Sequence, residues 1–287
     1  MYSDELAVTQ REWAERALLV TRNLLPKMAP ISNYSEWQSR EWETILYLVT
    51  ATARASESAI LLCAYGQLWD AEVLVRSALE GSLKFAYLLQ ARESFGIRHA
   101  EYADQLFDLA LVKDHRKAES LLKAVPDPDA PRWRPIRELL LPHAEFNKLS
   151  ARIDRVARRA LESRWGFTGL IQELVSSGDP FFGGLDALAH MYSMASHVQH
   201  VDLVGASIAL ERDKRKPDIR DSIHLAHEAR LLSDLLSFLF MRLLVGYRYI
   251  GADMSQIAEI KSAIDEAETP FKHATESWLR LQYPDEI

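Results

Sequence analysis

Cysteine, glycine and proline are scarce in this sequence of 287 residues, which has one Cys, 11 Gly and 11 Pro. The single thiol, Cys63, can form neither an internal disulfide nor a cysteine-rich metal site, so we expect a reducing compartment. A hydrophobic content of 48% argues against a disordered chain, and the low glycine and proline content excludes a collagen-like one. The composition is typical of a globular protein with a large core.

Short motifs of several common chemistries are absent as well. The sequence has no phosphate-binding loop, no dinucleotide-binding glycine pattern, no His-Glu-x-x-His pair and no Gly-x-Ser-x-Gly elbow. Cys63 follows Ile60, Leu61 and Leu62, and we predict that it lies in the core rather than acting as a nucleophile. No cofactor is predicted.

Long uninterrupted apolar runs are also missing. The most hydrophobic stretch, Leu231 to Ile250, contains Asp234, Arg242 and Arg248, which are three charges that a membrane span would not readily bury. The first thirty residues include four acidic side chains and no unbroken apolar core, unlike a signal peptide. We expect a cytoplasmic protein without a membrane segment, in which the apolar stretch forms a buried helix.

Helical periodicity is present in almost every window, without the alternating pattern of strands. The predicted fold class is all-α, as a single bundle of long, mostly antiparallel helices over residues 1–287. Three prolines interrupt the loop 125–131, where the bundle could have a weak subdivision. Helices are expected at about 4–25, 35–65, 70–89, 95–124, 144–163, 185–210, 219–250, 255–268 and 270–281.

The helix expected from about residue 70 carries a charged pair, Arg76 and Glu80. At about 100° per residue these two side chains share one face with apolar neighbours. The helix is apolar almost all round, so a charged pair on it costs free energy unless other polar groups complete its hydrogen bonds. One interpretation is an internal polar site, with Glu80 as a base or ligand and Arg76 as an anion anchor. The other is an ordinary i,i+4 ion pair at an edge of the bundle.

Histidines are concentrated in the second half of the chain, where five of the nine lie between His190 and His227. Imidazoles with a carboxylate suit zinc or iron, so one hypothesis is a metal-binding bundle that uses this cluster, with His197, His200 and His224 as candidate ligands. The Glu-x-x-His pairs of di-iron bundles are absent. We therefore favour hydrogen-bonded or solvated histidines and name no metal.

Positive charge is concentrated between Arg132 and Arg164, where nine basic residues accompany four acidic ones in a chain of net charge −7. Arg152, Arg155 and Arg159 share a helix face. A basic face can bind phosphate backbones, and neighbouring aromatic side chains can stack on bases. The alternative is a solvated helix face. The aromatic residues near this segment are Trp133, Phe146, Trp165 and Phe167.

The segment Arg76-Ser-Ala-Leu-Glu80 in an apolar helix, with a distant Tyr192-x-x-x-Ser196-His197, resembles a bacterial family of all-helical proteins with a domain of unknown function. An Arg-x-x-x-Glu helix and a Ser-His helix are the recognisable features of that family. The resemblance implies a helical core in which Arg76, Glu80, Ser196 and His197 converge. It implies no established activity.

A more distant resemblance is to the HEPN superfamily of helical bundles, many of which are ribonucleases of toxin–antitoxin and phage-defence systems. Their signature is an Arg followed, after four to six residues, by a His, and the best-placed match is Arg220 to His227. The resemblance implies a metal-independent ribonuclease, in which a His acts as general base or acid and an Arg stabilises charge on the phosphate. The first candidate catalytic set is Arg76, Glu80, Ser196 and His197, and the second is Arg220 with His227.

Three classes of function therefore stay open. A ribonuclease predicts a polar pocket and RNA as its partner. A non-catalytic module that binds a protein encoded nearby, or regulates it, predicts an exposed apolar groove. A metal-binding bundle predicts a bound ion. For each class we expect a homodimer, because symmetric dimers are the commonest soluble oligomers.

Overall fold

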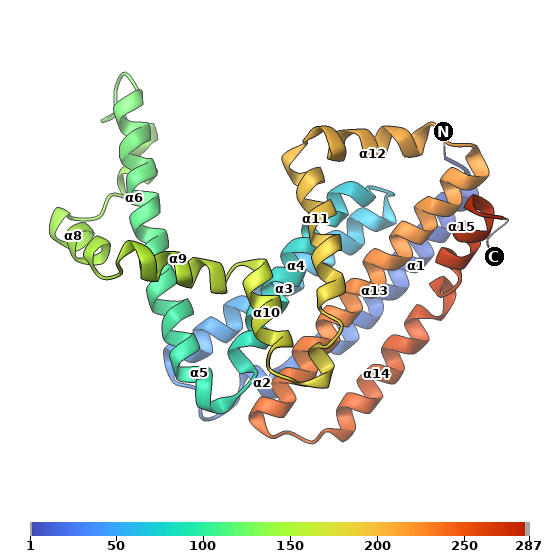
Figure 1. Ribbon diagram of the computed structural model, residues 1–287, viewed down its shortest axis with the longest axis horizontal. Coiled ribbons are helices and arrows are strands. Elements are labelled where there is room, and N and C mark those ends of the chain that lie inside the picture. The colour runs from blue at the N-terminus through green and yellow to red at the C-terminus, as the bar shows by residue number, and fades with distance from the viewer. Residues whose placement is uncertain (1, 285–287) are drawn as a thin grey trace. The chain divides into compact units, whose positions relative to one another are not determined.

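The computed structural model describes residues 2–284, and the side chains of residues 189–192 lie outside what it describes. Every regular element in the described residues is helical, so the predicted all-α class is confirmed (Figure 1). The chain divides into two compact units, Met1–Gln90 with Leu174–Ile287 (unit 1) and Ala91–Glu173 (unit 2). The loop 125–131, where a weak subdivision was expected, lies within unit 2.

Unit 1 contains most of the long helices. They are α1 (Asp4–Leu24), α2 (Ala29–Ser32), α3 (Ser39–Ala64), α4 (Leu68–Leu89), α11 (Asp186–His200), α12 (Leu203–Asp213), α13 (Pro217–Ile250), α14 (Ser255–Glu268) and α15 (Ala274–Gln282), with short 3-10 turns at Leu25–Met28, Pro180–Phe182 and Thr269–Phe271.

Local sequence explains the ends of α3 and its close contact with α4. The Glu41 side chain accepts a hydrogen bond from the backbone N–H of Gln38 at 2.9 Å, so the helix begins at Ser39. It ends before Gly66, whose φ of +68° favours glycine. A Cβ atom on Gly81 of α4 would lie 2.3 Å from Cγ2 of Thr52 in α3. Glycine at position 81 therefore permits the two helices to pack closely.

The central helix of unit 1 is α13, which contacts α1, α4, α14 and α15 (Figure 1). Leu231, Leu236 and Leu243 are fully buried, so the prediction of a buried helix across this apolar stretch is confirmed. Arg242, in the same stretch, is buried and donates a hydrogen bond to the Ser82 hydroxyl at 2.6 Å. Ser82 of α4 thus provides an acceptor for one of the hydrogen-bond donors of this buried guanidinium.

The expectation of one helix over 185–210 was wrong, because the chain turns between α11 and α12. Val201 has a φ of +49°, which no helix can continue through. Asp202 then caps α12 by accepting a hydrogen bond from the Gly205 N–H at 3.0 Å. A Cβ atom on Gly205 would lie 2.2 Å from the His197 carbonyl oxygen, so the corner also needs a glycine.

By length and composition alone, one helix within residues 2–284 could cross a membrane, namely α3. A third of its most apolar window is buried in the structure. Core helices of soluble proteins meet the same two criteria, so this finding alone is weak evidence of a membrane span.

Unit 2 consists of α5 (Arg92–His99), a π-helical segment (Ala100–Leu106), α6 (Phe107–Ala124), α7 (Arg134–Arg137), α8 (His143–Ala151) and α9 (Arg155–Arg164), with a 3-10 turn at Pro131–Trp133; α10 (Phe167–Val175) spans the boundary. The buried Glu101 of the π segment accepts a hydrogen bond from Nε1 of Trp165 at 2.8 Å and pairs with Arg164. This carboxylate joins the end of α9 to the π segment.

A buried acid, Glu228, lies on α13. Its side chain is fully buried, and neither carboxyl oxygen has a hydrogen-bond partner in the described part of the chain. Burial raises the pKa of Glu228 to about 8. A carboxyl group in such surroundings is stable in its protonated, neutral form.

Stability should therefore fall as pH rises through this range. Glu228 binds a proton more tightly in the folded chain, so its contribution is fully present below the unfolded pKa of about 4.5 and is lost as pH rises through the folded pKa of about 8. Chemical unfolding should show that the free energy of unfolding of the wild type is about 2 kcal/mol lower at pH 8.5 than at pH 6.5. Glu228→Gln should abolish this loss and the exposed-site control Glu12→Gln should keep it. If the free energy of unfolding of Glu228→Gln fell with pH as much as that of the wild type, Glu228 would not be the group responsible.

Candidate functional site

A chain of hydrogen bonds links three helices of unit 1 through His227 of α13. The Nε2 atom of His227 lies 2.8 Å from Oε2 of Glu72 in α4, and its Nδ1 atom lies 2.9 Å from Nη2 of Arg212 in α12. A guanidinium can only donate, so Nδ1 accepts and the ring proton resides on Nε2, which donates to the carboxylate. Burial, with the charge of Arg212, lowers the pKa of His227 to about 4. The imidazole is therefore neutral at pH 7.

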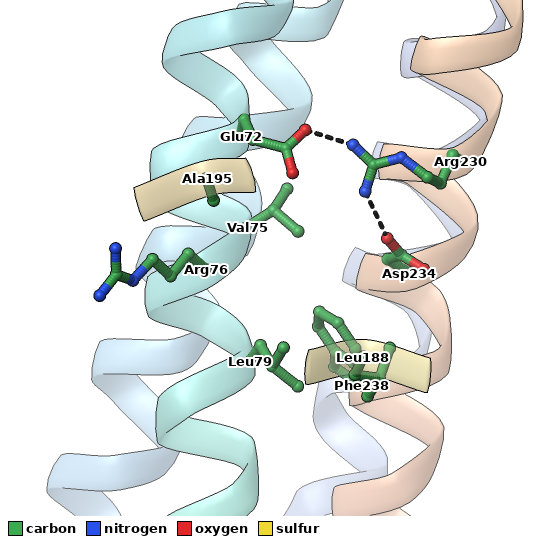
Figure 2. A pocket seen from close by; sticks show the side chains of 9 residues that line it. All are labelled: Glu72, Val75, Arg76, Leu79, Leu188, Ala195, Arg230, Asp234 and Phe238. Carbon is green, nitrogen blue, oxygen red and sulfur yellow. Dashed lines mark hydrogen bonds and ion pairs between the residues drawn. The ribbon is translucent and has the colours of Figure 1, made fainter. Parts of the chain in front are cut away.

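Glu72 is bonded on its other side to a second arginine. Arg230 donates to Glu72 and, at 3.1 Å, to Asp234 one turn further along α13 (Figure 2). Burial alone raises the pKa of Glu72, but the hydrogen bond from His227 and the charge of Arg230 hold it below its usual value. Burial raises the pKa of Asp234 to about 6, against the effect of Arg230. Glu72 is thus the charged carboxylate at the centre of the cluster.

Arg212 is 7% exposed and packed against aromatic rings. Its guanidinium carbon lies 4.3 Å from the centre of the Trp69 ring, a cation–π geometry. Its Nη1 atom also lies 3.4 Å from Nδ1 of His224, whose ring is 4.5 Å from that of Tyr2. Burial lowers the pKa of Arg212 to about 10, so the side chain stays charged at neutral pH.

Several of these groups line a cleft of about 380 Å³ within unit 1. Its polar wall contains Arg212, Arg230, His227 and Glu72. Its remaining wall is apolar or aromatic and contains Trp69, Met194, Ile223, Ala226, Trp278 and the methyl-bearing Thr275. With His227 neutral, two positive charges accompany one negative charge in this lining.

Two hydrogen-bond donors in the cleft lining are unsatisfied. Nε of Arg212 and Nε1 of Trp278 are both buried, and neither has an acceptor within residues 2–284. An unsatisfied buried donor costs about 1–3 kcal/mol, and such groups in native structures usually have a bound partner. Two residues of the cleft lining therefore carry a donor that has no acceptor in the described chain, and in this conformation both nitrogens lie behind the cleft surface.

A much smaller cavity, of about 10 Å³, shares Glu72 and Arg230 with this cleft (Figure 2). Leu188 and Ala195 of α11 line it together with Arg76 of α4. Figure 2 shows the Arg76 guanidinium directed away from Arg230. The volume is about that needed for one water molecule, so the larger cleft is the better ligand site.

Arg76 and Glu80, the first sequence-predicted pair, form the i,i+4 ion pair that was one of the two interpretations. Nε of Arg76 lies 3.5 Å from Oε1 of Glu80, and both side chains are partly exposed. Because Arg76 and Ala195 line the same small cavity, α11 packs against α4 just before Ser196 and His197.

His197 forms a pair that sequence reasoning did not anticipate. Its Nδ1 atom lies 2.6 Å from Oδ2 of Asp202, across the corner between α11 and α12. The His197 side chain is 36% exposed, and Ser196 is half-buried. A carboxylate at Nδ1 fixes the orientation of an imidazole and leaves Nε2 as its second nitrogen.

The second predicted set, Arg220 and His227, has separate contacts in the structure. Arg220 donates to Asp221 at 3.0 Å and lies 4.6 Å from the centre of the Tyr2 ring, whereas His227 bonds Glu72 and Arg212. The arginine that meets His227 is therefore Arg212, from the preceding helix.

The predicted metal candidates do not gather in the described side chains. His197 pairs with Asp202, His224 contacts Arg212 and Tyr2, and His200 is exposed. No three His, Cys, Asp or Glu side chains among those described are arranged to hold a metal ion. His190 and Tyr192, also named from the sequence, have side chains outside the described set.

The basic segment forms a second cleft, of about 420 Å³, in unit 2. Arg155, Arg158 and Arg159 of α9 line it, whereas Arg152 pairs with Asp108. The aromatic residues expected to assist are differently placed: Trp165 and Phe167 are buried, Phe146 stacks on His115, and Trp133 lies beside Arg132.

Sequence reasoning missed Glu72, Arg212 and Arg230 as site residues. Glu72 lies one turn before the conspicuous Arg76, and Arg212 lies between the helices expected at 185–210 and 219–250, although the structure places it in α12. The i,i+4 spacing of Arg230 and Asp234 on an apolar helix is a signal comparable to that of Arg76 and Glu80, and it could have identified that pair.

Comparisons of this chain with protein-family models, with curated proteins and with solved structures find no match.

Removing the charge of Glu72 should destabilise unit 1. Glu72→Gln keeps the shape of the side chain but removes the buried anion that accepts from Arg230 and His227, and breaking such an arrangement costs about 3 kcal/mol. Urea unfolding at pH 7 measures the loss, with the exposed Glu15→Gln as the matched control. A difference from wild type below about 0.5 kcal/mol would contradict a central role for this carboxylate.

Proposed function

We propose that unit 1 binds a small anionic molecule that carries a flat aromatic group. The observation that carries this proposal is the pair of unsatisfied buried donors, Nε of Arg212 and Nε1 of Trp278, in the lining of the 380 Å³ cleft. A phosphate, carboxylate or sulfonate would supply the acceptors that the described chain lacks, once a small movement of the two side chains opens these nitrogens to the cleft. Ligand pockets of about 300–1,000 Å³ with mostly apolar walls and a few convergent polar groups are typical of small-molecule sites.

The charges and shape of the cleft support an anion with a ring. Arg212 and Arg230 outnumber the single carboxylate of Glu72, and His227 adds no charge. Trp278 and Trp69 provide flat apolar surface beside these charges. A purely aliphatic anion would leave the aromatic wall without a contact, and a neutral ring would leave Arg212, which bonds two histidines, without an anionic partner.

The proposal can be tested with 8-anilinonaphthalene-1-sulfonate, a fluorescent aromatic anion. We expect saturable binding at one site per chain at pH 7. Trp278→Phe, which keeps a ring but removes the N–H donor, should weaken binding about 5- to 10-fold. Arg212→Gln should weaken it at least about 10-fold, and the exposed Arg16→Gln should leave it unchanged.

Competition then narrows the ligand class. Adenosine monophosphate and indole-3-acetate should displace the dye, whereas neutral adenosine and aliphatic succinate should not. The proposal would be contradicted if the wild type showed no saturable dye binding. It would also be contradicted if Trp278→Phe and Arg212→Gln bound the dye as tightly as the wild type and Arg16→Gln.

A metal-independent ribonuclease is the second candidate, with RNA as its partner. Its support is the His197–Asp202 pair: the carboxylate orients Nδ1, and the partly exposed imidazole is suited to proton transfer through its other nitrogen. The helix that carries His197 packs on the helix that carries Arg76, the candidate for phosphate-charge stabilisation.

Cleavage of single-stranded RNA in the presence of EDTA tests this candidate. We expect His197→Gln to lose activity and Asp202→Asn to lose about 10- to 100-fold, because the imidazole loses its orienting charge. His143→Gln, an exposed histidine of unit 2, is the control. Activity that disappears with EDTA, or that survives in His197→Gln, would contradict it.

A further inference from the structure

A row of exposed side chains runs along α3 to Tyr65, the residue that follows it, on the face that the rest of unit 1 leaves uncovered. Tyr47, Leu61 and Tyr65 are 67%, 48% and 76% exposed, although their side chains are large and mainly apolar. Ala51, Arg54 and Ser58 are the exposed residues between them. We refer to these six residues, Tyr47, Ala51, Arg54, Ser58, Leu61 and Tyr65, as the α3 stripe.

The stripe has a symmetric spacing. Its successive steps are 4, 3, 4, 3 and 4 residues, so the pattern is the same when read from either end, with its midpoint at position 56. Steps of three and four keep the residues on one face of a helix over about 27 Å. A two-fold axis through the midpoint would therefore align this face with its own antiparallel copy.

The residue types match in that alignment. Tyr47 would lie opposite the partner's Tyr65, which brings two exposed aromatic rings together at each end. Ala51 would lie opposite the partner's Leu61, so a small side chain faces a large one, as close helix packing requires. Arg54 would lie opposite the partner's Ser58, a small side chain that leaves space for the longer arginine.

Charge complementarity favours the same alignment. Between positions 44 and 65 the only charged residues are Arg54 and Glu57. Glu57 lies on one flank of the stripe, where it accepts from Arg22 at 2.6 Å. The two-fold axis would bring each Arg54 within about one residue of the partner's Glu57, with opposite charges alternating across the axis. A parallel pair would instead place Arg54 beside the partner's Arg54.

We propose that the α3 stripe is a self-association surface, and that its occupant is a second copy of this chain bound antiparallel about position 56. The expectation of a homodimer thereby gains a defined interface and register. The length and composition of α3 also meet the criteria of a membrane span. In this proposal its exposed apolar residues contact a second protein chain rather than lipid. This proposal does not depend on the ligand-binding proposal, because none of the six residues lines the cleft.

Engineered cysteines test the register directly. In the antiparallel dimer, a cysteine at position 51 would face position 61 of the second copy and would lie about 15 Å from that copy's position 51. The same separation applies to position 61, so Ala51→Cys can cross-link with Leu61→Cys but neither variant can cross-link with itself. Under mild oxidation a mixture of the two variants should form a covalent heterodimer, and neither variant alone should do so. The native Cys63 is buried, and burial raises the pKa of its thiol, so it should contribute no background.

Sedimentation velocity supplies the second readout. We expect a concentration-dependent dimer in the wild type, conversion to monomer by Ser58→Arg, and no change from Leu19→Arg, which alters an exposed apolar residue of α1. Circular dichroism confirms that each variant is folded.

Three outcomes would overturn the proposal. The first is cross-linking of Ala51→Cys with itself, which would indicate a parallel pair. The second is a wild type that stays monomeric at all concentrations, with no cross-linking in the mixture of variants. The third is a monomer that co-sediments with phosphatidylcholine–phosphatidylglycerol vesicles and loses this binding in Ser58→Arg.

Discussion

The buried carboxylate of Glu72 is the group on which the polar interior of unit 1 depends. It accepts from His227 and Arg230 on α13 while it is itself anchored on α4, so one side chain joins the two central helices. Through His227 it also fixes the ring orientation that Arg212 of α12 requires. Without this anion, Arg230 would keep only Asp234 as its counter-charge and the ring N–H of His227 would lose its acceptor, so the cluster is stable as a set.

The same arrangement explains why the cleft is chemically incomplete. Two nitrogens of Arg212 bond histidines and its face contacts Trp69, but Nε has no acceptor within the described chain. His227 is held neutral with both nitrogens engaged, which suits a positioning role better than proton transfer in this conformation. His197 has the opposite character, since Asp202 orients it at an exposed corner. Binding and proton transfer therefore have separate candidate residues on neighbouring helices.

The fold class could be predicted from periodicity, because nearly every helix has one apolar face. The corner at Val201 could not, since a β-branched residue with positive φ is an unfavourable choice that only the surrounding packing maintains. Arg76 and Glu80 were conspicuous because they are close in sequence. Glu72 and His227 are 155 residues apart, and no local pattern links them. Long-range polar pairs of this kind arise from how helices pack, which a single sequence does not encode in any short window.

The central claim concerns the state of His227, and nitrogen chemical shifts of the histidine rings test it most directly. We predict that a ¹⁵N NMR spectrum assigns His227 as the neutral Nε2–H form, with no titration between pH 7 and pH 5, since its pKa lies at about 4. Addition of an aromatic anion should shift its Nδ1 resonance, which faces Arg212. A His227 that titrates near pH 6.5, or that carries its proton on Nδ1, would contradict the account.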